Sequence, residues 1–249
     1  MDDKNKPITP DQTKKNWHGT MQVVEPYVFK IFTPDVSGTG FQISYSAKPG
    51  FCAVATAYHV IKQAYLWKQP IKLVHWKSGK SIFLEASNRA VYIYPDNDLA
   101  FILFDATDDA LQSVQMPLLN KDYSLFPGVE LAWCGFPVVM DETLCFFAGH
   151  VSAYHQSTAA YLIDGVAING VSGGPVFFHN LVDGKLTIAG VISNYLPNRS
   201  NGDATPGLAV ARSVAPYQAD LEKLNSLAQA QTQQPENQRP ENQEATQQT

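Results

Sequence analysis

The most informative residues of this 249-residue sequence are Gly170-Val171-Ser172-Gly173-Gly174-Pro175, a glycine-rich turn directly before the apolar run at residues 175–179. A nucleophilic serine needs an exposed hydroxyl and nearby backbone N–H groups that face the developing oxyanion, and glycines allow the tight backbone that supplies both. The alternative interpretation is an ordinary glycine-rich turn that leads into a strand. Because these residues occur together, they are more specific than an isolated Gly-x-Ser-x-Gly.

A histidine and an aspartate at the ends of apolar runs are the candidates to activate this serine. His59 follows the run at residues 52–56, and Asp98 directly precedes the run at residues 99–104. Taken singly, His59 is more typical of a buried core histidine, and Asp98 is more typical of an ordinary turn aspartate. Asp96, which lies just before Asp98, competes with it for the same role.

The order of these residues along the chain distinguishes between three kinds of serine-nucleophile fold. In α/β-hydrolases the acid and the histidine follow the serine. Here the only histidine after Ser172 is His179, which lies within the next predicted strand. A subtilisin-type order would require Asp35, His59 and Ser172 on an α/β fold, and this sequence lacks the helices of such a fold. The order His59, Asp98, Ser172 is that of the chymotrypsin group.

The remaining chain consists mostly of short runs rich in β-branched and aromatic residues, separated by Gly, Pro, Asn and Asp. These are signals of strands and turns. A polar stretch at about residues 105–122 divides the runs into two series. We therefore predict an all-β, chymotrypsin-like fold of two packed antiparallel six-stranded β-barrels. The predicted strands are residues 28–32, 39–45, 52–56, 71–76, 81–86, 91–94 and 99–104, then residues 130–134, 144–152, 161–163, 175–179, 186–193 and 208–211.

Both ends of the chain depart from this strand pattern. Residues 1–18 are predicted to be a flexible N-terminus, and residues 229–249, rich in Gln, Glu, Asn and Pro, are predicted to be a disordered tail because they have little to bury. Between them, residues 19–228 form one predicted domain. It consists of a first barrel at about 19–110, a second barrel at about 123–212 and an amphipathic helix at about 214–228, whose apolar residues Val214, Tyr217, Leu221, Leu224 and Ala228 have helical spacing.

The composition argues against several classes of function. The formal net charge of −5 disfavours nucleic acid as a partner. The acidic N-terminus is not a secretory signal, and no apolar run approaches the roughly 20 residues that span a bilayer, so we expect a cytoplasmic protein without membrane association. Cys52, Cys134 and Cys145 lie in apolar segments without metal-ligand spacing, which predicts reduced, buried thiols and no metal or other cofactor. A monomer is the default expectation.

Six short motifs in register make the chain resemble the trypsin-like serine peptidases over about residues 39–212, and within them the bacterial Deg, or high-temperature-requirement, branch. The motifs are Gly38-Thr39-Gly40-Phe41, Thr56-Ala57-Tyr58-His59-Val60, Asp98-Leu99-Ala100, Cys134-Gly135-Phe136-Pro137, Gly149-His150-Val151-Ser152-Ala153, and the run Asp164-Gly165-Val166-Ala167-Ile168-Asn169 that leads into Gly170–Pro175.

This resemblance implies a serine endopeptidase whose active site lies in the cleft between two barrels. Ser172 would be the nucleophile, His59 the general base and Asp98 the residue that orients it. The backbone N–H groups of Gly170 and Ser172 would form the oxyanion hole. The peptide substrate would lie along Ser193, Asn194 and Tyr195, and the pocket for the side chain before the cut would be lined by Val166, Ala167, Tyr195 and Gly207. Without a charge at its base, this pocket predicts a preference for small or aliphatic side chains over Lys or Arg.

Departures from the family pattern bear on regulation. Val171 replaces the aspartate that pairs with a newly cleaved N-terminus in digestive members, and no Ile-Val-Gly-Gly start is present, so we expect no zymogen cleavage. We expect no PDZ domain after the predicted helix. The alternative function is a latent or inactive protease-fold module that binds or scaffolds, and a flipped Asn169–Gly170 peptide would produce such a latent state. Esterase or other acyl-transfer activity is a further alternative.

Overall fold

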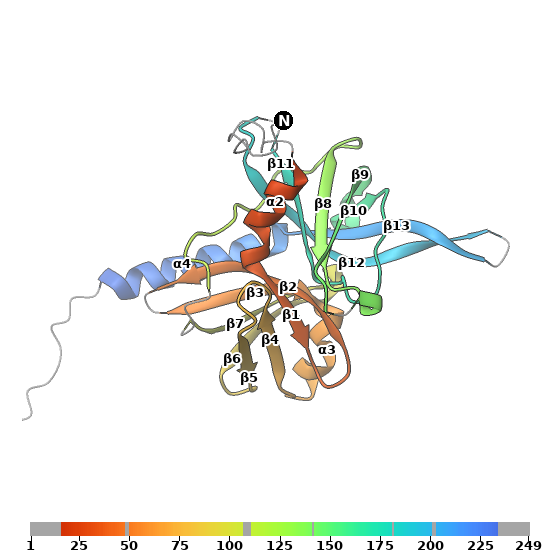
Figure 1. Ribbon diagram of the computed structural model, residues 1–249. Helices are drawn as coiled ribbons and strands as arrows, with labels where there is room; N and C mark the ends of the chain where they lie inside the picture. Colours follow the sequence, from red (N-terminus) through yellow and green to blue (C-terminus); the bar gives the residue numbers. More distant parts are fainter. Residues whose placement is uncertain are drawn as a thin grey trace, which may run out of the picture.

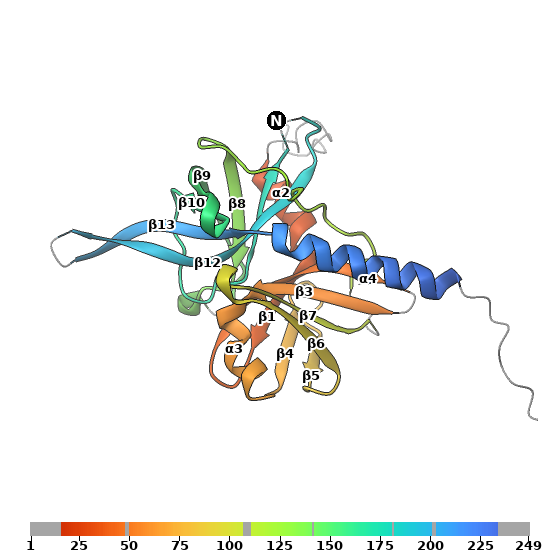
Figure 2. The same ribbon diagram turned by 180° about the vertical axis from the view of Figure 1, so that it is seen from behind.

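The computed structural model describes residues 16–47, 50–106, 111–140, 142–180, 182–200 and 203–233. These residues form two antiparallel β lobes, with a long helix near the C-terminus that lies along them (Figures 1 and 2). The predicted all-β class is confirmed. The predicted segments 1–18 and 229–249 lie largely outside the described residues, although the first described helix already begins at Trp17 and the last described helix continues to Gln233.

The first lobe is a seven-stranded sheet in the order β5-β4-β1-β2-β3-β7-β6, in which all neighbouring strands are antiparallel. It differs in detail from the closed six-stranded barrel expected from the sequence. No ladder joins the edge strands β5 and β6, and the Arg89 guanidinium instead donates hydrogen bonds to the carbonyl oxygens of Leu84, Ala64 and Gln69. Its strands are β1 (Val28–Phe32), β2 (Ser37–Ser46), β3 (Phe51–Ala57), β4 (Ile71–His75), β5 (Ser81–Leu84), β6 (Arg89–Tyr94) and β7 (Leu99–Asp105).

The second lobe is a closed six-stranded barrel in the order β10-β13-β12-β11-β8-β9, as predicted. Two of its strands run well past their predicted ends and form a long hairpin that projects from the body (Figure 1). The strands are β8 (Glu130–Gly135), β9 (Cys145–His155), β10 (Ala160–Ile163), β11 (Pro175–His179), β12 (Leu186–Ser200) and β13 (Asp203–Ser213).

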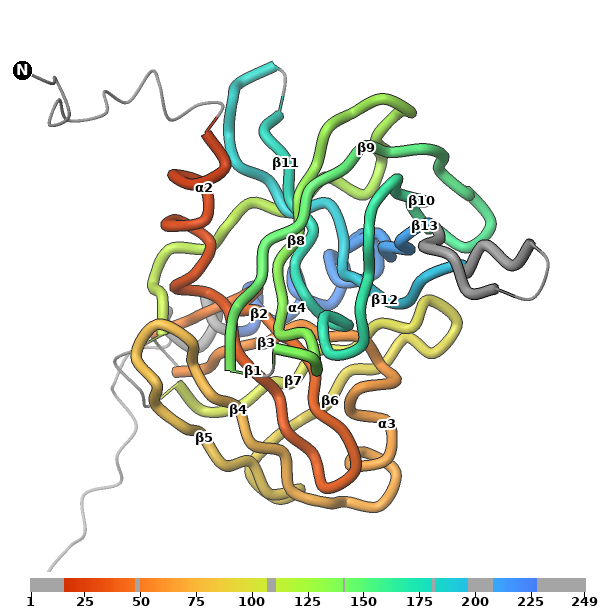
Figure 3. The backbone as a smooth tube through the Cα atoms, turned by 45° about the vertical axis from the view of Figure 1, so that its right-hand side comes forward, coloured from red at the N-terminus to blue at the C-terminus, as the bar shows by residue number. Residues whose placement is uncertain are grey.

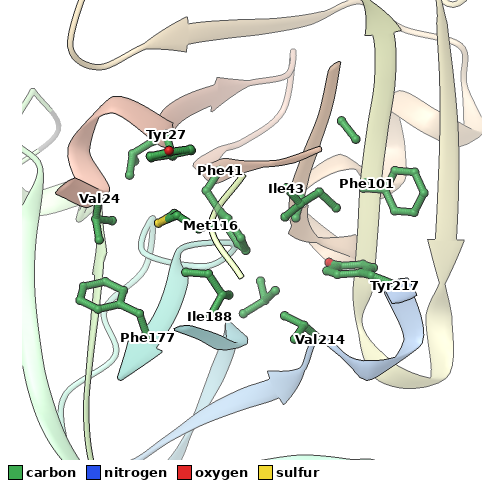
Figure 4. Close-up of a cluster of buried hydrophobic side chains, with 14 of the residues drawn as sticks. Val24, Tyr27, Phe41, Ile43, Phe101, Met116, Phe177, Ile188, Val214 and Tyr217 are labelled. Carbon is green, nitrogen blue, oxygen red and sulfur yellow. The ribbon is translucent and has the colours of Figure 1, made fainter. Parts of the chain in front are cut away.

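The two lobes share an apolar interface because alternate residues of a strand point to opposite faces. On β7, Leu99 and Phe101 face the interface, whereas Ala100 and Ile102 lie in the interior of the first lobe. Burying a side chain as large as Phe101 contributes about 2 kcal/mol, so the interface holds the lobes firmly together. Figure 4 shows its main members, which are Val24, Tyr27, Phe41, Ile43, Phe101, Met116, Phe177, Ile188, Val214 and Tyr217.

Three α-helices complete the described fold, of which the sequence predicted only the last. Helix α2 (Trp17–Val24) lies beside the second lobe (Figure 3). Its Trp17 ring packs against Phe177 of that lobe. Helix α3 (Tyr58–Leu66) follows β3 directly. Helix α4 (Ala215–Gln233) places the buried hydroxyl of Tyr217 3.0 Å from the carbonyl oxygen of Ala100, to which it donates a hydrogen bond. This helix therefore ties the end of the second barrel to the first lobe.

Candidate active site

An open pocket of about 430 Å³ lies where the two lobes meet. The first lobe contributes His59 and Asp98 to its lining, and the second lobe contributes the loop before β11 and the middle of β12. The structure thus brings the three predicted catalytic residues to one pocket, although they are far apart in the sequence. The described residues of the lining are His59, Asp98, Ala167, Ile168, Asn169, Ser172, Ser193, Asn194, Tyr195 and Arg212.

His59 owes its position to the start of helix α3. The backbone N–H of Tyr58 donates to the carbonyl oxygen of Asp98 at 3.0 Å, and the backbone N–H of His59 donates to Oδ1 of Asp98 at 2.9 Å. The imidazole Nδ1 of His59 lies 2.8 Å from the other carboxylate oxygen, Oδ2. Because an ionised carboxylate only accepts hydrogen bonds, Nδ1 carries the proton and Nε2 is left as an acceptor toward the pocket.

Asp98 occupies the left-handed backbone region, with φ 50° and ψ 42°, at the end of a short 3₁₀ turn (Pro95–Asn97). Burial raises the pKa of its carboxyl group, but the hydrogen bonds and charge of His59, together with the Ser193 hydroxyl at 2.5 Å, outweigh burial and lower the pKa. Asp98 is therefore ionised at neutral pH. Asp96 is exposed on the same turn and makes no described contact with His59, so the geometry favours Asp98 of the two candidates.

The hydroxyl of Ser172 is hydrogen-bonded to the second lobe rather than to His59. Its Oγ donates a hydrogen bond to the carbonyl oxygen of Ser193 at 3.0 Å. Within the described residues, no hydrogen bond joins Ser172 Oγ to His59. Such bonds are often absent in enzymes without substrate and form only when the substrate is in place.

The loop that carries Ser172 is held from the first lobe by Thr39. The Thr39 backbone N–H donates to the carbonyl oxygen of Ser172 at 2.9 Å, and its hydroxyl donates to the carbonyl oxygen of Gly170, also at 2.9 Å. Phe136 N–H in turn donates to the Thr39 hydroxyl oxygen at 3.0 Å. Thr39, from the Gly38-Thr39-Gly40 motif, therefore fixes both residues of the predicted oxyanion hole.

The backbone around Gly170 leaves two N–H groups free. Gly170 has a φ of 94°, a value that glycine adopts readily and other residues rarely do. The carbonyl oxygen of Asn169 accepts a hydrogen bond from the Val138 N–H at 2.8 Å, so in a trans peptide the Gly170 N–H points the opposite way. Neither this N–H nor that of Ser172 donates to another described residue. This arrangement is the opposite of the flipped Asn169–Gly170 peptide considered above.

The predicted substrate-binding residues divide into two groups. Ala167, Ser193, Asn194 and Tyr195 line the pocket. Val166 is not among the lining residues and is 46% exposed, so the structure does not bring it together with the other four. Gly207 lies on β13, but its surroundings are not described, so its place in the pocket stays a prediction.

Sequence reasoning missed three residues of the lining, namely Ile168, Asn169 and Arg212. The first two adjoin the predicted Ala167 and Gly170 and could have been found from that proximity. Arg212 follows Ala209 and Ala211 with the alternation of a strand, which indicates an outward-facing charge. The part of the cleft that Arg212 faces depends on how β13 pairs with β12, which the sequence alone does not give.

The described residues contain no cluster of three or more His, Cys, Asp or Glu side chains that could hold a metal ion. None of their helices is long and apolar enough to cross a membrane. Cys52, Cys134 and Cys145 are all unpaired, and Cys145 is only half-buried, unlike the two others. Burial raises the pKa of the Cys52 and Cys134 thiols well above the ordinary value, so these thiols are neutral packing groups.

The ionised Asp98 is expected to stabilise the fold at neutral pH and to lose this effect in acid. Its folded pKa lies below the value of about 3.9 for an unfolded aspartate, so the unfolded chain binds the proton first and acid favours unfolding. The contribution is complete above the unfolded pKa and disappears as the pH falls through the folded pKa. Thermal unfolding of the wild type and Asp98→Asn checks this, because the advantage of the wild type in Tm should shrink in acid. An advantage that grows on acidification would contradict it.

Neither a protein-family model nor a curated protein sequence matches the chain. Solved structures do match its fold. A serine endoprotease from Yersinia pestis superposes with a TM-score of 0.60 at 19% identity, over 88% of this chain and 68% of that one. Deg5 gives a TM-score of 0.59 at 19% identity, over 85% and 94% of the two chains. The HtrA-type protease AlgW with tripeptide gives 0.60 at 18% identity, over 86% of this chain and 64% of that one.

These similarities define the class of fold. The chain has the trypsin-like fold of two β lobes with a cleft between them. Within that class it is similar to the structures of Deg and HtrA-type proteases, as the sequence resemblance predicted. Sequence identities of 18% to 19% establish a shared fold and do not establish a shared activity.

Proposed function

We propose that the chain is a serine endopeptidase that hydrolyses peptide bonds through an acyl-enzyme. The observation that carries this proposal is the hydrogen bond of 2.8 Å between His59 and an ionised Asp98, in the same pocket as Ser172. In addition, the backbone N–H groups of Gly170 and Ser172 donate to no other described residue. An orienting carboxylate, a base, a nucleophile and oxyanion donors are the parts that acyl transfer requires.

The chemistry follows from the protonation states at the site. Ser172 Oγ attacks the substrate carbonyl carbon while its proton passes to His59 Nε2. The backbone N–H groups of Gly170 and Ser172 bind the oxyanion of the tetrahedral intermediate, and the imidazolium then protonates the leaving amine. Water, deprotonated by His59, releases the acid product and restores the free serine.

Substrate binding itself would prepare the nucleophile. The carbonyl oxygen of Ser193, which accepts the hydrogen bond of the Ser172 hydroxyl, belongs to the strand segment proposed to pair with the substrate backbone. A substrate N–H that binds this carbonyl would replace the Ser172 hydroxyl, which could then turn toward His59. The Val138–Asn169 hydrogen bond supports an oxyanion site already open, and thus an active enzyme rather than a latent binding module.

The preference before the cut is proposed to be for small or aliphatic side chains. Ala167 and the half-exposed Tyr195 line the pocket, and among the described residues no acidic side chain other than the already bonded Asp98 does so. A basic side chain would therefore find no partner there. The three unpaired cysteines support action in a reducing compartment such as the cytoplasm.

Cleavage of an unfolded protein tests the proposal. Purified chain incubated with casein should yield peptides that mass spectrometry identifies, with cuts mainly after small or aliphatic residues. Ser172→Ala, which removes only the hydroxyl, should yield none. Equal cleavage by the two proteins would mean a contaminating protease, and cuts mainly after Lys or Arg would overturn the proposed preference.

A further inference from the structure

Arg212 brings a positive charge into the candidate cleft that the catalytic chemistry does not use. On β13, Ala209 and Ala211 point into the core of the second barrel, so Arg212 points outward, where it lines the pocket. It pairs with Val191 of β12, whereas Tyr195 pairs with Ala209 further along the ladder. Arg212 therefore lies at the Asp98 end of the cleft rather than beside the proposed pocket wall.

The guanidinium of Arg212 is incompletely satisfied by the protein. Its Nη1 donates to the carbonyl oxygen of Thr158 at 3.3 Å, whereas its buried Nε has no hydrogen-bond partner. Among the described residues, no carboxylate forms an ion pair with it. Buried polar groups are nearly always hydrogen-bonded, and each exception calls for an explanation. A carboxylate brought by a ligand could accept from this guanidinium through two parallel hydrogen bonds.

The other charged groups of the pocket do not compensate this cation. Asp98 is the only carboxylate among the described residues of the lining, and it already accepts hydrogen bonds from His59 and the Ser193 hydroxyl. His59 can only be neutral or positive. An acidic side chain is thus the one kind of charged group that the unused part of this cleft favours.

We propose that Arg212 binds an acidic side chain, Asp or Glu, of the second residue before the cut. This rests on the proposed endopeptidase function. A substrate strand along Ser193–Tyr195 presents alternate side chains to opposite sides. The first would point to Ala167 and Tyr195, so the next would point to the side of the pocket lined by His59 and Asp98. Asn97 directly precedes Asp98 in the chain. The Nδ2 group of Asn97 donates to the same Thr158 carbonyl as Arg212 does, which places Arg212 on that second side.

Two peptides that differ only by an exchange of Glu for Gln test the proposed role of Arg212. Fluorogenic peptides with Glu or Gln at the second position before the cut should differ in kcat/KM by on the order of tenfold or more in favour of Glu, mainly through KM. Arg212→Gln should abolish this difference, and Arg212→Lys, which keeps the charge but loses the bidentate geometry, should retain part of it. Equal values for Glu and Gln in the wild type, or a Glu preference that survives in Arg212→Gln, would overturn the proposal.

A binding measurement separates this proposal from the proposed function. The catalytically disabled Ser172→Ala protein should bind the fluorescent Glu peptide more tightly than the Gln peptide by fluorescence anisotropy, and Ser172→Ala/Arg212→Gln should bind both alike. Labelling of the wild type by a fluorophosphonate tests the enzymatic function separately. If the wild type is not labelled, the enzymatic function fails while the binding assay still decides the role of Arg212. Binding without any Glu preference refutes that role even if labelling is strong.

Discussion

Asp98→Asn is expected to lower kcat by on the order of 10⁴-fold while the chain stays folded. The reason lies in the hydrogen bonds of the carboxylate, whose two oxygens accept from the backbone N–H and from Nδ1 of His59. An asparagine has one oxygen and one NH₂ group. If the oxygen keeps the backbone N–H, the NH₂ faces Nδ1 and forces the ring proton onto Nε2. A protonated Nε2 cannot accept the proton of Ser172.

Asp96→Asn is the matched control because it changes an exposed carboxyl group on the same turn to the same amide. Peptide hydrolysis by this variant should equal that of the wild type, and circular dichroism should show both variants folded. Loss of activity in Asp96→Asn with retention in Asp98→Asn would transfer the orienting role to Asp96 and contradict the geometry described above.

Gly170→Ala is expected to reduce kcat by about 10²- to 10³-fold, the effect of losing one oxyanion donor. A Cβ atom at this position would overlap the carbonyl oxygen of Phe136 and lie 2.9 Å from the backbone nitrogen of Val138. The positive φ of 94° adds strain that an L-residue avoids. The loop must therefore move, which takes the Gly170 N–H away from the oxyanion position.

Gly128→Ala separates this local effect from the general strain of a positive φ. Gly128 has a φ of 89°, and an added Cβ would meet nothing within 4 Å. This variant should lose some stability and keep the wild-type kcat per folded molecule. Steady-state kinetics on fluorogenic peptides, corrected for the folded fraction, compares the two. A Gly170→Ala enzyme with unchanged kcat would show that its N–H does not bind the oxyanion.

The strands and the candidate triad could be predicted from the sequence because their signals are local. Alternation on β7 puts Phe101 at the interface and Ala100 in the lobe interior, and the order of His59, Asp98 and Ser172 depends only on the chain. Helix α2 could not be predicted in this way. It contains Gly19 and is stabilised by distant contacts such as the 2.8 Å hydrogen bond between Thr20 and His179.

The features that sequence reasoning missed depend on pairing between distant segments. In the first lobe, the described edge strands β5 and β6 form no ladder, and the Arg89 guanidinium donates to three backbone carbonyl oxygens, two of which are distant from it in the sequence. The place of Arg212 in the cleft depends on its pairing with Val191, and the resting direction of the Ser172 hydroxyl depends on the carbonyl of Ser193. None of these contacts leaves a periodic or local trace in the sequence.

Covalent labelling by a fluorophosphonate probe is the most direct test that Ser172 is an activated nucleophile beside His59. The probe reacts only with a serine whose hydroxyl is deprotonated by a base and whose oxyanion is stabilised, so it requires no knowledge of the substrate. We expect the wild type to be labelled, with mass spectrometry placing the adduct on Ser172, and we expect Ser172→Ala and His59→Ala to remain unlabelled. Well-folded wild-type protein that does not react, or labelling that persists in Ser172→Ala, would contradict the assignment.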